Sequence, residues 1–233
     1  MSEKKEYTTA IILAAGIGSR FDASIPKQRL SLLGKSLISR VAEPFYVCDD
    51  VDSIVVVTRS EDIEFVNHEL RFLKKKLYAV VPGGECRAES ARLGFLEIPP
   101  QTTHVAIHDG ARCLITADAI GDVIRASFAS GAASAVSPIV STIKQVNEGK
   151  IIGTVPRNEL VFAETPQVFS CDIYEKALSS CKLDVSSITD DNMLLESIGV
   201  NVTAVMIGAE NPKITYPRDL EYAEFLLKRR EGK

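Results

Sequence analysis

The sequence predicts an α/β fold built on a doubly wound, mostly parallel, Rossmann-like sheet. Short apolar runs rich in β-branched residues alternate along the chain with segments of helical spacing. Continuous apolar runs are typical of strands covered on both faces, and strands that alternate with helices form parallel sheets. Because ligands of such sheets bind beyond the carboxyl ends of the strands, the loops at those ends are the candidate site.

Five predicted strands lie in the first part of the chain. They are TTAIIL (8–13), SIVVVT (53–58), LYAVV (77–81), HVAIH (104–108) and ASAVSPIV (133–140). Segments of helical spacing separate them at 37–48, 61–70, 87–96 and 116–129. The loops after residues 13, 81 and 108 carry Gly, Arg and Asp, and we expect them to converge.

The alternation stops at residues 141–170. STIKQV, the turn NEGK and IIGTV predict a β-hairpin, and no clear helix follows it. The pattern leaves two interpretations open, a protruding arm that packs on a second subunit and a plain edge hairpin. We expect a single domain over 1–233 with a β-arm at about 141–170. The remaining predicted elements are helices at 171–181 and 189–197, strands at 202–207 and 213–216, and a helix from Pro217 to about Arg229.

Composition restricts the class of protein. The 233 residues are 45% hydrophobic and 25% charged, and the formal net charge is −4, so the chain as a whole is not expected to attract nucleic acid. The sequence contains no run of about 18 apolar residues, and we expect no membrane span. The five cysteines form no CxxC pair and do not combine with the three histidines at zinc-ligand spacing. We therefore expect reduced thiols and a cytoplasmic location.

The stretch LAAGIGSRFDASIPKQ (13–28) has the character of a phosphate-binding loop. It differs from the dinucleotide fingerprint because Phe21 stands at the third glycine position, and it lacks the Gly-Lys-Ser/Thr ending of a Walker loop. Backbone N–H groups near Gly16 and Gly18 can still approach phosphate oxygens, because no Cβ intervenes.

Two cations follow these glycines. Arg20 offers a planar fork of donors and Lys27 a mobile point charge. Two cations beside one triphosphate can neutralise the charge that develops during phosphoryl transfer. A glycine turn with two solvated basic residues is the alternative interpretation, and the Pro-Lys pair at this spacing favours the functional one.

Two later loops place polar side chains at strand ends. GGECRAES (83–90) leads into a helix N-terminus, which favours anions, and its polar candidates are Arg87 and Ser90; an ordinary turn is the alternative. HDGAR places Asp109 where a carboxylate could hold Mg²⁺, although a turn-capping role is common for Asp. We interpret His108 as structural, because a phosphate monoester with a second pKa of about 6 needs no general base near pH 7.

Several stretches together resemble one enzyme family. They are AAGIGSRF with PKQ, GGECRAES, HDGAR, TVPRNEL (154–160), ETPQVF (164–169), TDD (189–191) and NPKIT (211–215). In this order, from about Thr8 to Leu227, they are similar to the 2-C-methyl-D-erythritol 4-phosphate cytidylyltransferases of the sugar-phosphate nucleotidyltransferase superfamily. The resemblance implies that CTP and methylerythritol phosphate yield a cytidine diphosphate conjugate and pyrophosphate, with Mg²⁺ or another divalent cation, in non-mevalonate isoprenoid biosynthesis.

The resemblance also implies roles for individual residues. It implies catalytic roles for Arg20, Lys27, Arg157 and Lys213, and metal binding by Asp109. The nucleotide contacts are Ala14, Ala15, Gly16, Gly18, Ser19, Gly83, Gly84, Arg87, Ser90 and Gly110. The contacts to the second substrate are Arg112, Thr142, Thr165 and Thr189, some of which reach across a homodimer through the arm. The chain departs from the usual family pattern at Cys113 and Pro212.

Three other functions share part of this pattern. A ribitol 5-phosphate cytidylyltransferase shares the glycine loop, the HD-x-x-R loop and the TPQ-F segment, whereas TDDNMLLESIG with NPKIT favours the methylerythritol enzyme. A regulatory protein that binds nucleotide without catalysis would need fewer cations. A dinucleotide-binding dehydrogenase is disfavoured by the missing third glycine.

Overall fold

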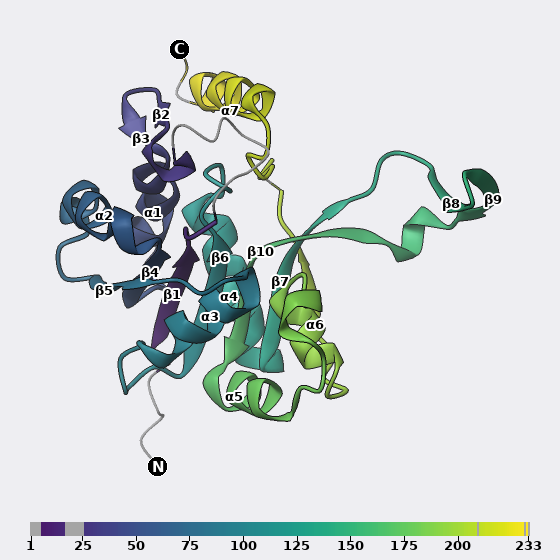
Figure 1. The fold of residues 1–233 in the computed structure, drawn as a ribbon, viewed down its shortest axis with the longest axis horizontal. Coiled ribbons are helices and arrows are strands. Elements are labelled where there is room, and N and C mark those ends of the chain that lie inside the picture. The colour runs from purple at the N-terminus through teal and green to yellow at the C-terminus, as the bar shows by residue number, and fades with distance from the viewer. Residues whose placement is uncertain (1–5, 17–25, 209, 231, 233) are drawn as a thin grey trace.

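The protein has a central seven-stranded sheet with helices on both faces (Figure 1). The computed structural model describes residues 6–16, 26–208, 210–230 and 232. In spatial order the strands of the sheet are β11 (Thr203–Met206), β7 (Ala132–Pro138), β10 (Val161–Ser170), β6 (His104–Asp109), β1 (Thr8–Leu13), β4 (Ser53–Thr58) and β5 (Leu77–Pro82). Among the described residues, no helix combines the length and the apolar character that a bilayer crossing requires.

The sheet is parallel except at one strand. β1 lies between β4 and β6 and pairs in parallel with both, with Leu13 opposite Asp109. β10 pairs antiparallel with both of its neighbours, β6 and β7. The prediction of a mostly parallel α/β sheet is therefore confirmed, and the ends of β1 and β6 lie side by side.

Alternate residues of the strands pack into two separate hydrophobic clusters, one on each face of the sheet. Ile12 packs in the cluster with α1, α2, α4 and α7, whereas Ile11 packs in the cluster with α3, α5 and α6. Because these strands are buried on both faces, their sequences are continuous apolar runs. The helices are α1 (Leu37–Val47), α2 (Ile63–Glu69), α3 (Arg87–Leu96), α4 (Ala117–Ser130), α5 (Cys171–Ser180), α6 (Asp191–Glu196) and α7 (Pro217–Arg230).

Helix α3 packs so closely on the sheet that Gly94 has no room for a side chain. A Cβ at this position would lie 2.6 Å from Cγ2 of Ile11 and 2.7 Å from Cγ2 of Val57. Gly94→Ala is expected to destabilise the protein, because two contacts under 3 Å put the overpacking cost in the upper part of its usual range of about 1–3 kcal/mol, above the roughly 1 kcal/mol that alanine gains in a helix. The midpoint of urea unfolding measures this. Gly208→Ala, where no atom lies within 4 Å, is the control, and a higher midpoint for Gly94→Ala would contradict the prediction.

Two predicted elements differ in the structure. Residues 213–216 form no strand; they run as a loop whose Ile214 N–H donates to Ala111 O at 2.8 Å, so the segment pairs with the loop after β6 instead of the sheet. Residues 161–170 form the ten-residue strand β10 within the main sheet, so the projecting part is shorter than the predicted 141–170. Buried polar residues (Glu164, Thr165, Gln167) hide this strand from an apolar pattern.

The predicted hairpin is confirmed and projects from the body of the protein (Figure 1). β8 (Ile143–Asn147) and β9 (Lys150–Val155) pair antiparallel. Their two-residue loop has positive φ at both Glu148 (46°) and Gly149 (76°), as a tight hairpin turn of matching twist requires. A second small hairpin joins β2 (Ser31–Leu32) to β3 (Lys35–Ser36).

Candidate active site

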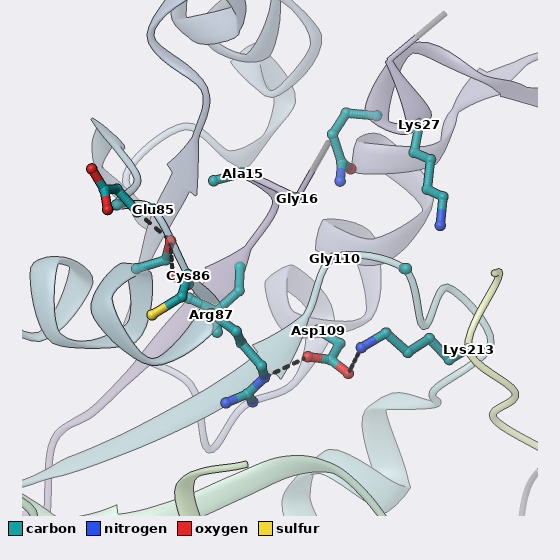
Figure 2. Close-up of a pocket in the computed structure, with 14 residues that line it drawn as sticks. Ala15, Gly16, Lys27, Glu85, Cys86, Arg87, Asp109, Gly110 and Lys213 are labelled. Carbon is teal, nitrogen blue, oxygen red and sulfur yellow. Dashed lines mark hydrogen bonds and ion pairs between the residues drawn. The ribbon is translucent and has the colours of Figure 1, made fainter. Parts of the chain in front are cut away.

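A cavity of about 430 Å³ opens where the loops after β1, β5 and β6 meet the C-terminal segment around Lys213 (Figure 2). The expected convergence of the three loops is therefore confirmed. Of the residues predicted for the site, the lining contains Ala15, Gly16, Lys27, Gly84, Arg87, Ser90, Asp109, Gly110 and Lys213. Leu13, Gln28, Glu85, Cys86 and Ala111 complete the lining.

Asp109 is the electrostatic centre of this cavity. Lys213 Nζ lies 2.9 Å from its Oδ2, Arg87 Nε 3.1 Å from its Oδ1, and Arg112 Nε 3.5 Å from its Oδ2. Burial by itself would raise the pKa of Asp109, but these three cations hold that pKa well below its usual range. Asp109 is therefore a carboxylate across the physiological pH range.

The donor set suits a hydrated magnesium ion better than a preformed metal cage. Asp109 and Glu85 are the carboxylates of the cavity lining, and within the described part of the chain no three His, Cys, Asp or Glu side chains gather as a metal cluster. Mg²⁺ commonly keeps several waters and takes one or two carboxylates together with substrate phosphates. Asp109 fits that requirement if the ion arrives with a triphosphate.

Two glycines allow the loops to approach one another. Gly110 N–H donates to Leu13 O at 2.8 Å, and a Cβ on Gly110 would lie 2.7 Å from that oxygen. A Cβ on Gly83 would lie 2.4 Å from Cβ of Ala15. Ser90 stabilises the same turn, since its hydroxyl accepts from Gly84 N–H at 3.1 Å and donates to a backbone carbonyl of the turn at 2.9 Å. Ser90 therefore stabilises the turn that forms part of the cavity wall.

Lys27 stands at the start of a 3₁₀-helix over Lys27–Arg29 and reaches the C-terminal segment. Its ammonium donates to Ile214 O at 3.1 Å. Arg29, in the same turn, pairs with Asp62, which is fully buried, at 2.7 Å, and Asp62 also pairs with Arg59 at 2.5 Å. The turn that carries Lys27 is therefore anchored to the loop that follows β4.

A chain of hydrogen bonds holds the backbone of Asp109 in place. Asp109 N–H donates to Thr165 Oγ1 at 3.1 Å, and Thr165 Oγ1 lies 3.0 Å from His108 Nδ1. His108 Nε2 lies 2.9 Å from Arg112 O. Because a carbonyl can only accept, Nε2 carries the proton, and the neutral ring accepts from the Thr165 hydroxyl at Nδ1. Thr165 and His108 therefore support the loop from behind the cavity.

The His108 ring is expected to make stability depend on pH. Complete burial lowers the pKa of His108 from 6.5 to about 4. Between these values the unfolded chain binds more protons, so stabilisation present above pH 6.5 is lost as the pH falls toward 4, by about 3 kcal/mol. His108→Asn is expected to flatten this fall in urea-unfolding midpoints measured from pH 7 to 4.5. An unchanged slope would contradict the assignment; some slope persists, because burial also lowers the pKa of His104.

Arg112 holds neighbouring segments together. Its guanidinium donates to Asn211 O at 2.8 Å and lies 3.4 Å from Glu164 Oε2 in addition to its contact with Asp109. The Asn211 amide in turn donates to Glu164 at 2.9 Å and to Thr165 O at 3.0 Å. These contacts join the loop after β6 to β10 and to the segment that carries Lys213.

Other predicted residues lie away from the cavity. Thr142 and Arg157 belong to the exposed arm, and Arg157 donates to Val140 O. Thr189 is exposed and contacts the sulfur of Met193 at 3.9 Å. Ala14 is buried behind the wall, where its N–H donates to Val57 O. Three predicted residues, Gly18, Ser19 and Arg20, lie outside the described residues.

Sequence reasoning missed Asp191, which is fully buried and pairs with Arg87 at 2.6 Å. It is the last residue of the TDD stretch that contributes to the family resemblance, so a signal was present at this position. Of this stretch, the family resemblance assigned a role only to Thr189. A buried carboxylate two residues away cannot be distinguished from a surface aspartate by sequence pattern alone.

Comparison with known proteins identifies the family of this chain. The family model for 2-C-methyl-D-erythritol 4-phosphate cytidylyltransferase matches residues 8–229. The enzyme of that name from Pelotomaculum thermopropionicum is 36% identical over 98% of this chain and 97% of its own length, and that from Desulforamulus reducens is 37% identical over 95% and 96%. The crystal structure of the Francisella tularensis enzyme of that name superposes with a TM-score of 0.78 at 30% identity, over 94% of this chain and 99% of its own. The chain belongs to the 2-C-methyl-D-erythritol 4-phosphate cytidylyltransferase family.

Proposed function

We propose that the protein transfers CMP from CTP to 2-C-methyl-D-erythritol 4-phosphate and releases pyrophosphate, as a step of non-mevalonate isoprenoid biosynthesis. The observation that carries the proposal is the ionised Asp109 in a cavity that also presents Lys27 and Lys213, in a chain of this family. Several cations around one cavity suit a reaction between two phosphate groups.

The reaction needs positioning and charge neutralisation more than proton transfer. The acceptor phosphate oxygen attacks the α-phosphorus of CTP, and the bond to pyrophosphate breaks as the new P–O bond forms. Mg²⁺ bound to Asp109 would neutralise charge on the triphosphate. In this proposal Lys27 and Arg20 neutralise charge on the triphosphate, and Lys213 positions the acceptor. Of the three cations around Asp109, Lys213 is the most exposed, 43% against 21% for Arg87 and 13% for Arg112, so it is the best able to turn to a ligand.

A two-acceptor assay tests the proposed reaction. The protein is incubated with CTP and Mg²⁺ and either methylerythritol 4-phosphate or ribitol 5-phosphate, and pyrophosphate release is measured. We expect rapid release with methylerythritol phosphate and little with ribitol phosphate, and no release after chelation of the metal by EDTA. Faster release with ribitol phosphate would reassign the acceptor. Tight CTP binding without release from either would indicate a regulatory protein.

We further propose that the active form is a cytoplasmic homodimer joined through the arm. Four apolar side chains on or beside the hairpin are largely exposed: Val140, Val146, Ile151 and Ile152. Clustered exposed apolar residues mark interaction surfaces. Thr142 and Arg157 lie on the same arm and outside the cavity, so a second copy could bring them to the substrate. Reduced cysteines, expected from the sequence, suit the cytoplasm.

Charged residues on the arm are expected to separate the subunits. Ile151→Asp with Ile152→Asp would place two carboxylates in an apolar contact, where an unpaired charge is strongly unfavourable. Sedimentation velocity should then show a monomer, with turnover reduced because the arm residues no longer reach the partner. Leu96→Asp, at an exposed apolar residue on α3, is the control and should remain dimeric. A monomeric wild type with full activity would refute the proposal.

A further inference from the structure

Arg87 lies between two carboxylates, and the closer one is outside the cavity lining. Its Nε is 3.1 Å from Asp109 Oδ1, whereas its Nη1 is 2.6 Å from Asp191 Oδ2. Arg87 is the first residue of α3 and Asp191 the first residue of α6, so two helices on the same face of the sheet meet at this guanidinium. Figure 2 shows Arg87 directed at Asp109 from the side opposite Lys213.

Asp191 is built into the protein as a fixed negative charge. Its side chain is fully buried, and its second oxygen, Oδ1, accepts from the Tyr174 hydroxyl at 2.8 Å. Its backbone N–H donates to Gln167 at 2.8 Å. Burial raises the pKa of Tyr174 well above its usual value, so the hydroxyl remains a donor. The Tyr174 ring packs against Phe169 and Phe95 at centroid distances of 5.5 and 5.0 Å, which holds its hydroxyl in position to donate to Asp191.

The charges around Asp109 explain why a second carboxylate is needed. Three cations, Arg87, Arg112 and Lys213, surround this single carboxylate. Without compensation, their combined field would oppose a divalent cation at Asp109. Asp191 neutralises Arg87, and Glu164, at 3.4 Å, neutralises Arg112. The exposed Lys213 is then the cation without a second carboxylate partner among these contacts, while the two half-buried arginines act as neutral pairs.

We infer that Asp191 is a positioning residue that neutralises and holds Arg87, and thereby keeps the Asp109 carboxylate available to a divalent cation carried by CTP. The inference rests on the proposed function and deepens it, because it assigns the metal affinity of the site to a residue that touches neither nucleotide nor acceptor. It also gives Arg87 a role different from a nucleotide contact.

The test measures how much Mg²⁺ improves CTP binding. CTP is titrated by calorimetry into the full-length protein without acceptor, once with excess Mg²⁺ and once with EDTA, and the ratio of the two dissociation constants is the magnesium gain. For Asp191→Asn we expect the gain to fall about tenfold or more, because the uncompensated Arg87 charge lies 3.1 Å from the carboxylate that would hold the metal. Metal-free CTP should bind as well as to the wild type or more tightly, since the cavity has become more positive.

Two further variants separate charge balance from structural damage. Tyr174→Phe removes a hydrogen bond but no charge, and it should retain the wild-type gain. The double variant Arg87→Met with Asp191→Leu removes both charges, and replacement of a buried ion pair by apolar residues is commonly tolerated. Its gain should return to within about threefold of the wild type, as expected for a balanced field. This double variant also tests the inference if Asp191→Asn does not fold.

The outcomes distinguish the inference from the proposed function. If Asp191→Asn weakens CTP binding by the same factor with and without Mg²⁺, Asp191 is merely structural and the inference is overturned. A gain that is lost in the double variant would also overturn it. If the wild type itself shows no magnesium gain, the metal role of Asp109 fails, and the inference fails with it.

Discussion

Replacement of Asp109 by asparagine is expected to lower turnover about 10²–10³-fold, the loss typical of one transition-state contact. The side chain keeps its shape but loses the charge that lies among Lys213, Arg87 and Arg112. Its amide oxygen is a weaker ligand for Mg²⁺ than a carboxylate oxygen. Pyrophosphate release under saturating substrates measures turnover, and its dependence on Mg²⁺ concentration should shift to higher values.

A second carboxylate of the same cavity supplies the matched control. Glu85 also lines the cavity but is exposed. Glu85→Gln is expected to change turnover by less than about threefold, as surface substitutions generally have small effects. Near-normal turnover of Asp109→Asn, or an equal loss in Glu85→Gln, would contradict the assignment of the metal to Asp109. A thermal melt of each variant separates loss of function from loss of folding.

Lys27→Ala is expected to lower turnover by a similar factor, about 10²–10³-fold, because it removes a cation from the triphosphate side of the cavity. The KM for CTP should rise less than kcat falls if the ammonium acts mainly on charge that develops in the transition state. The contact to Ile214 O is lost with the ammonium, and a thermal melt of the variant measures whether the fold persists. Steady-state kinetics of pyrophosphate release give both constants.

A lysine outside the cavity controls for the general effect of charge removal. Lys35 is half exposed and pairs with Glu43 at 2.7 Å on the surface. Exposed ion pairs contribute about 0–1 kcal/mol to stability, and Lys35→Ala should leave turnover unchanged. Turnover of Lys27→Ala close to that of the wild type would refute the proposed role of this lysine.

Strands that are buried on both faces could be predicted from the sequence, because their pattern is local. β1, β4 and β6 are continuous apolar runs, and their bounds in the structure match the predicted ones to within one residue. The loops that follow them were recognisable as a site because parallel strands bring their carboxyl ends to one edge. This reasoning correctly placed Gly16 and Asp109 together.

β10 could not be predicted in the same way. Its buried residues Glu164, Thr165 and Gln167 are polar, and each is satisfied by partners distant in sequence, namely Asn211, His108 and Asp190. A polar segment is predicted as a loop unless those partners are known, since only tertiary hydrogen bonds make its burial favourable. The prediction of a strand at 213–216 was wrong for a different reason. This segment hydrogen-bonds to the loop after β6 and not to the edge of a sheet.

The sequence by itself determined the α/β class, the two-sided core, the cavity-forming loops and most of the side chains that line them, because hydrophobic period, glycine and charge are properties of short stretches. Only the tertiary structure decided which charges pair. Asp191 lies 104 residues from Arg87 along the chain, as Lys213 does from Asp109. Electrostatic energy depends on distance in space and on burial, and neither can be read from separation in sequence.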